Sequence, residues 1–124
     1  MNIALTQIGQ IFVTVHDLAR AVAFYRDTLG VKHLFSAGNM AFFACGGIRL
    51  MLGIPEKPEF DHPSSILYFR VENIEAVANE LAGRGVAFES MPHLIARMPD
   101  HELWMAFFRD SESNVMALMC EKPA

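Results

Sequence analysis

Cysteine is scarce in this chain, and the chain has no long apolar run. Cys45 and Cys120 are the only cysteines among its 124 residues, which excludes a disulfide-rich scaffold and indicates a reducing compartment. No apolar stretch reaches the length needed to span a bilayer. The N-terminal segment also lacks the basic residues that precede the apolar core of a signal peptide. We therefore expect a cytoplasmic protein that makes no membrane contact.

Positive charge is also in short supply. Asp and Glu number 14 and Lys and Arg number 10, giving a net charge of -4, and the basic residues form no run. Binding to phosphate backbones needs a positive field, so nucleic acid is excluded as the expected partner.

Apolar residues are abundant instead. They make up 52% of the chain, enough for a large core in a chain whose length fits one domain. The alternative explanation of so high a fraction is an apolar surface that a partner covers.

The stretch from Ile8 to Val31 sets the pattern of the chain. Gln10–Val15 is rich in β-branched and aromatic residues and predicts a strand. Asp17 stands where a helix N-cap is expected, and Gly30 where a left-handed helix stop is expected. Between them, apolar residues at helical spacing define one apolar stripe of a helix: Leu18, Val22, Tyr25 and Leu29.

Three closely spaced strands are predicted next, with turn residues between them. They are Val31–Phe35, Met40–Cys45 and Ile48–Leu52, and such short connections predict an antiparallel meander. Three prolines then mark Gly53–Pro63 as an irregular linker.

The pattern then returns. Val15–Leu18 has its counterpart in Val71–Ile74, with Asn73 as the second N-cap. Ile66–Val71 predicts the strand before this joint, and Val86–Glu89 a short strand after the helix. We expect 91–101 to be irregular, because Pro92 and Pro99 interrupt it. Two further strands are predicted at Leu103–Arg109 and Asn114–Cys120.

Two such repeats predict an α+β fold: two βαβββ modules that form a curved, mixed, mostly antiparallel sheet around a cleft. We expect a single domain, with module one at about 8–53, the linker at 53–63 and module two at about 64–120. A ferredoxin-like βαββαβ sandwich is the alternative, but too many strands follow each helix for that arrangement.

The repeated module resembles the vicinal oxygen chelate superfamily of glyoxalases, bleomycin-resistance proteins and dioxygenases. VHDLARAVAFYRDTLG is similar to the first helix signature of that family, and FFRDSESNVMALM to its closing strand pair. The resemblance covers nearly the whole chain. It implies the glyoxalase fold and a homodimer.

The resemblance also implies four strand positions that commonly bind a divalent metal. By position they correspond to Gln10, Met51, Ile66 and Ala117. Ile and Ala have no donor atom, and a thioether is a poor ligand for hard or borderline cations. We therefore predict no metal and no other cofactor, and we interpret these four residues as ligand-binding positions. Tyr68, two residues from Ile66 on the same strand, joins them.

His93 and His101 bracket the segment expected to be irregular, and Arg97 lies between them. Such segments often line binding sites. The two histidines are candidates for an acid–base pair, a relocated metal pair or polar anchors for a ligand, with a purely structural role as the bland alternative. Arg97 is a candidate ligand contact.

Trp104 begins an aromatic strand and shares a face with Ala106 and Phe108. This face is either ordinary core or part of a pocket lining, and we include Trp104 among the candidate ligand contacts.

Two functions follow from these patterns. The first is a protein that binds a small, largely apolar or aromatic molecule without the family's metal. The second is a metal-dependent enzyme, a glyoxalase-type lyase or isomerase or a dioxygenase, with a relocated site. The metal content of protein purified without chelators distinguishes these two functions.

Overall fold

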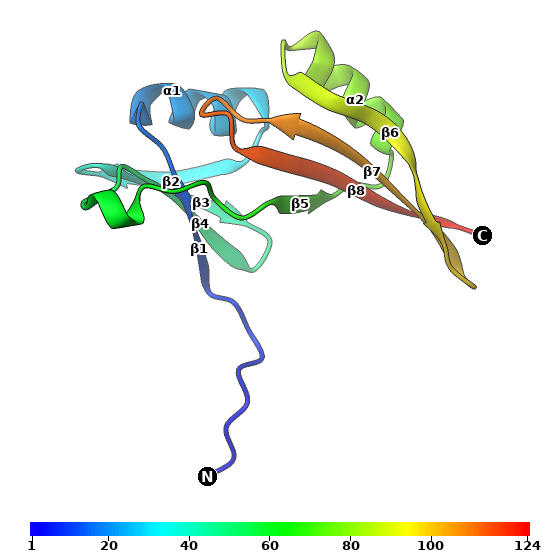
Figure 1. The fold of residues 1–124 in the computed structure, drawn as a ribbon, viewed down its shortest axis with the longest axis horizontal. Helices are drawn as coiled ribbons and strands as arrows, with labels where there is room; N and C mark the ends of the chain where they lie inside the picture. Colours follow the sequence, from blue (N-terminus) through cyan, green and yellow to red (C-terminus); the bar gives the residue numbers. More distant parts are fainter. The chain divides into compact units, whose positions relative to one another are not determined.

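The computed structural model describes residues 1–124 and confirms the repeated βαβββ order (Figure 1). The chain divides into two compact units, Met1–His62 and Pro63–Ala124. Each unit holds one helix-bearing module, and strands pair only within their own unit. The sheet is therefore divided into two four-stranded mixed sheets of an α+β protein.

The first unit has the strand order β1-β4-β3-β2. β1 runs parallel to β4, and the other neighbours are antiparallel. The strands predicted from the sequence are found with bounds shifted by two residues or fewer: β1 (Gln10–Thr14), β2 (Lys32–Ala37), β3 (Met40–Cys45) and β4 (Ile48–Gly53).

Strand alternation gives this sheet two different faces. One face packs against helix α1 (Leu18–Ala23), where Tyr25 lies 6.1 Å from Phe43 between ring centroids. The buried residues of this side are Val13, Val15, Ala41, Phe43, Leu50 and Leu52. The opposite face, which we call the helix-free face, carries Phe12, Met40, Phe42 and Met51.

The predicted N-cap and helix stop of the first module are both present. Asp17 accepts a hydrogen bond from the backbone N–H of Arg20 at 3.1 Å. After α1 the backbone widens into one π-helical turn, η1 (Phe24–Thr28). Gly30 then has φ 75°, a left-handed conformation that a side chain would disfavour.

The second unit repeats this arrangement with the strand order β5-β8-β7-β6. Its elements are β5 (Leu67–Arg70), α2 (Ile74–Gly83), β6 (Ala87–Arg97), β7 (His101–Arg109) and β8 (Val115–Pro123). Asn73 caps α2 by accepting a hydrogen bond from the Ala76 N–H at 3.1 Å, as predicted. Ile74, Ala78 and Leu81 of α2 are buried.

The expectation of an irregular segment at 91–101 is wrong. β6 continues to Arg97, and only a short turn separates it from β7. β6 is the edge strand of its sheet, and the register with β7 shifts at three places along it. An edge strand leaves alternate N–H groups unpaired, so it tolerates Pro92, and bulges absorb the remaining irregularity.

Both cysteines are free thiols; Cys45 is half-buried and Cys120 is buried. None of the helices has the length and apolar composition that crossing a membrane requires.

Candidate ligand pocket in the first unit

Gln10 and Met51, two of the predicted ligand-binding positions, are in contact. They lie on the helix-free face of β1 and β4. The Gln10 Nε2 group donates a hydrogen bond to the Met51 sulfur at 3.4 Å. The amide of Gln10 is thus directed at a thioether on the neighbouring strand.

Three further predicted positions gather in the second unit. Tyr68 pairs with Ala117 in the β5–β8 register, and Phe107 follows on β7. The Tyr68 and Phe107 rings meet edge to face with centroids 6.2 Å apart, and Ala117 between them is fully buried. Ile66 directly precedes β5 and is partly exposed. Ile66, Tyr68 and Ala117 therefore belong to one face of the second sheet.

Trp104 and Arg97 lie elsewhere. Trp104 follows the alternation of Ala106 and Phe108, so it points to the opposite side of the sheet from Phe107 and Ala117. Its indole N–H donates to Glu102 at 3.1 Å, and the Lys122 ammonium lies 4.2 Å from its ring centroid. Arg97 also pairs with Glu102, at 3.4 Å. Both residues belong to a polar cluster at the ends of β6, β7 and β8.

His93 and His101 do not form a pair. His93 is in register with Met105, and His101 lies four residues from Met105, about 13 Å along the strand. Each imidazole has its own partner: His93 Nδ1 donates to the Met91 carbonyl at 2.9 Å, and His101 Nδ1 donates to Asp100 at 2.8 Å. That separation is too large for the two to share a metal ion or a proton.

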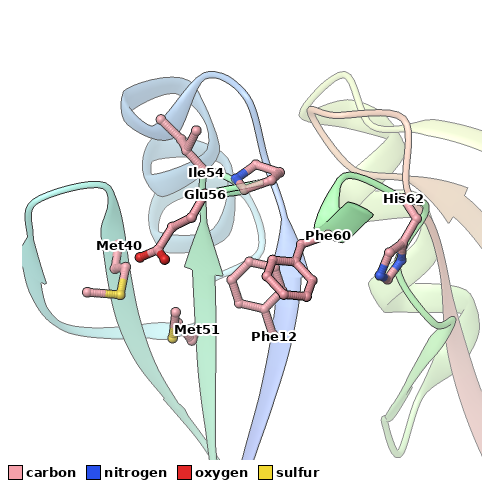
Figure 2. Close-up of a pocket in the computed structure, with 8 residues that line it drawn as sticks. Phe12, Met40, Met51, Ile54, Glu56, Phe60 and His62 are labelled. Carbon is pink, nitrogen blue, oxygen red and sulfur yellow. The ribbon is translucent and has the colours of Figure 1, made fainter. Parts of the chain in front are cut away.

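The first unit contains a pocket that the sequence did not predict as a whole. Its volume is about 300 Å³, at the lower end of the range for small-molecule sites. The side chains that line it come from the helix-free face and from the segment after β4 (Figure 2): Phe12, Met40, Met51, Ile54, Pro55, Glu56, Phe60 and His62.

Strand pairing explains the floor of the pocket. Phe12 is in register with Met51, and Met40 pairs with Gly53 on the other side of β4. An aromatic ring and two flexible thioethers therefore share one patch of sheet. Methionine adapts to ligands of different shape because its side chain is unbranched and polarisable.

The wall of the pocket is the segment Ile54–His62, which sequence reasoning treated only as a linker. Ile54 donates its backbone N–H to the Asn39 carbonyl at 3.0 Å. A short 3-10 helix, η2 (Pro58–Phe60), begins with proline and places Phe60 at the cavity. The His16 imidazole contacts Asp61 at 2.8 Å, which ties the end of the segment to the joint before α1. The sequence signal that could have indicated this wall is Phe60, a single aromatic residue among the prolines of the segment.

A second, more open hollow of about 530 Å³ lies at the other end of β1 and β4. Glycines from the β3–β4 turn, together with Gln10 and Arg49, contribute to its lining. The Arg49 guanidinium lies 5.9 Å from the centroid of the Phe42 ring.

The sequence model of the Glyoxalase/Bleomycin resistance protein/Dioxygenase superfamily matches residues 7–118. The chain belongs to that superfamily. The protein YraH of Bacillus subtilis strain 168, described as uncharacterized, is 28% identical over 88% of this chain and 94% of its own length.

Solved structures of other proteins have the same fold. TnmS3, an antibiotic binding protein from Streptomyces sp. CB03234, superposes with a TM-score of 0.76 at 25% identity, over 99% of this chain and 100% of its own. A glyoxalase family protein from Bacillus anthracis superposes with a TM-score of 0.76 at 20% identity, over 98% of this chain and 100% of its own.

The residues at the four positions that the family resemblance implies as metal ligands offer few donors for a metal ion. Gln10 alone offers an oxygen or nitrogen donor, and its amide nitrogen is directed at the Met51 sulfur. Ile66 and Ala117 have hydrocarbon side chains. Neither unit brings together three or more His, Cys, Asp or Glu side chains that could hold a metal elsewhere.

Proposed function

We propose that this member of the glyoxalase superfamily binds a small, largely apolar or aromatic molecule in the pocket of the first unit, without a metal ion. The observation that carries the proposal is the lining of that pocket. Two phenylalanine rings, two methionines, Ile54 and Pro55 supply most of the surface, with Glu56 and His62 as the only ionisable groups. A few polar groups in an apolar cavity are typical of sites that bind small molecules.

The likeness to TnmS3 supports the same reading, because that protein is described as antibiotic binding. We extend to this chain only the general capacity to hold an organic molecule. Ile66, Tyr68 and Ala117 stay predicted ligand contacts in the second unit. A cytoplasmic homodimer stays the predicted form of the protein.

Ligand binding can be tested with 2-naphthol as a neutral aromatic probe, using amide chemical shifts in ¹H–¹⁵N spectra. We expect the shifts to concentrate on β1, β4 and Ile54–His62. Phe12→Ala should weaken binding about tenfold, because it removes a ring from the lining. Phe35→Ala is the matched control, since Phe35 is an exposed ring stacked on Phe42 outside the pocket. Equal effects of the two variants, or no binding, would contradict the proposal.

Metal independence is tested by the metal content of protein purified without chelators. We expect substoichiometric metal and no thermal shift on adding Zn²⁺, Mn²⁺ or Ni²⁺, because a cation that loses its water needs replacement ligands. A stoichiometric metal would instead favour a glyoxalase-type lyase, isomerase or dioxygenase.

A further inference from the structure

One charged side chain in the pocket has no partner within the protein. Glu56 lines the cavity, and its carboxylate makes no hydrogen bond or ion pair. Figure 2 shows the carboxylate turned toward the side chains of Met40 and Met51. A carboxylate beside thioethers and rings loses hydration when a ligand fills the cavity, and that loss is costly unless the ligand supplies an opposite charge.

The aromatic rings of the pocket also favour a positively charged ligand. Phe12 and Phe60 both line the cavity, and the face of a phenylalanine ring attracts cations through its quadrupole. Phe60 already has a cation near it, because the Lys57 ammonium lies 6.0 Å from its ring centroid. Lys57 is not part of the lining, so the cavity itself contains no lysine or arginine.

The surrounding charges favour a cation as well. The segment Ile54–His62 carries Glu56, Glu59 and Asp61 against Lys57 alone. Asp61 is engaged by His16, and of the three carboxylates only Glu56 lines the cavity. Arg49, the arginine of the helix-free face, lines the separate open hollow.

We infer that the preferred ligand carries a protonated amine on its apolar or aromatic body, with Glu56 as the counter-ion and the rings of Phe12 and Phe60 as the contacts of the body. This inference rests on the proposed function and names the chemical class that the same pocket takes.

The test compares 2-naphthylmethylamine, which is protonated at neutral pH, with 2-naphthylmethanol, its neutral analogue of nearly the same shape. Both are titrated into the full chain by calorimetry. We expect the amine to bind about tenfold more tightly, the usual size of one charge-assisted hydrogen bond. Glu56→Gln should reduce this preference to about twofold or less, chiefly by weakening the binding of the amine. Glu56 is exposed, so the variant should fold, and its melting curve checks this.

Arg49→Gln is the matched control, because it changes a charge on the same sheet outside the pocket, and it should leave the preference for the amine intact. Equal affinity of the parent protein for the two compounds would overturn the inference and leave the proposed function standing. A preference that survives Glu56→Gln would also overturn it. Binding of neither compound would overturn the proposed function and this inference with it.

Discussion

The ring of Phe12 lies directly against the backbone of Gly53. A Cβ atom at Gly53 would come within 2.5 Å of Phe12 Cε2 and 3.1 Å of Cζ, closer than side chains pack. Gly53 is buried, and it does not have a positive φ angle that would itself require glycine. The glycine therefore leaves the space in which the Phe12 ring lies at the floor of the pocket.

We predict that Gly53→Ala displaces the Phe12 ring. The forced shift should lower the free energy of unfolding by about 1–3 kcal/mol, as overpacking usually does, and should weaken binding of 2-naphthol. Urea unfolding and the naphthol titration measure the two effects. Gly47→Ala is the control, since nothing lies within 4 Å of a Cβ there. Unchanged stability and affinity in Gly53→Ala would show that the ring is free to move.

The two helix N-caps should each contribute measurably to stability. Asp17→Ala and Asn73→Ala each remove an acceptor for a backbone N–H at the first turn, which should cost about 1 kcal/mol. Chemical denaturation followed by circular dichroism gives the values. Serine at either position should restore most of the loss, because its hydroxyl also accepts this bond. If the alanine variants unfold at the parent's denaturant concentration, the caps do not stabilise the helices.

The Cys45 thiol should react slowly with alkylating agents. Burial raises the pKa of Cys45 above its ordinary value, so less thiolate is present at a given pH, and the thiolate is the nucleophile. Iodoacetamide modification of the Cys120→Ala variant should be slower than that of glutathione near pH 8. Its rate should also continue to rise at a pH where glutathione has levelled off. A rate equal to that of glutathione would contradict the prediction.

We predict that the protein is a homodimer. Several large apolar side chains are more than two-fifths exposed in the single chain, among them Phe35, Tyr68 and Ile95, and a partner copy would cover apolar surface of this kind. Light scattering at micromolar concentration should give twice the chain mass of 13.9 kDa. A mass of one chain would contradict the prediction.

Local sequence signals predicted the repeated architecture well. Asp17, Asn73 and Gly30 each act through neighbouring backbone, so their roles can be inferred without knowing the fold. The strand alternation that separates Phe43 from Phe42 is also a local property.

Features that depend on strand position or on packing were harder to predict. Pro92 indicated a break, and only its place on an edge strand makes it compatible with β6. Phe60 and Glu56 line the pocket because η2 and the contact of Asp61 with His16 shape the segment, and no periodic pattern signals such an arrangement. Gln10 and Met51 are in contact; both had been assigned as ligand positions from the family resemblance.

Each unit forms all of its strand pairs within itself, and this bears on whether the chain can be circularly permuted. β1 and β5 each pair in parallel with the last strand of their own module. All strands of one sheet therefore precede the junction between His62 and Pro63, and all strands of the other sheet follow it. A circular permutant opened at that junction would keep every strand pair of both sheets. The strand hydrogen bonds of the two sheets therefore do not depend on which half of the protein comes first in the chain.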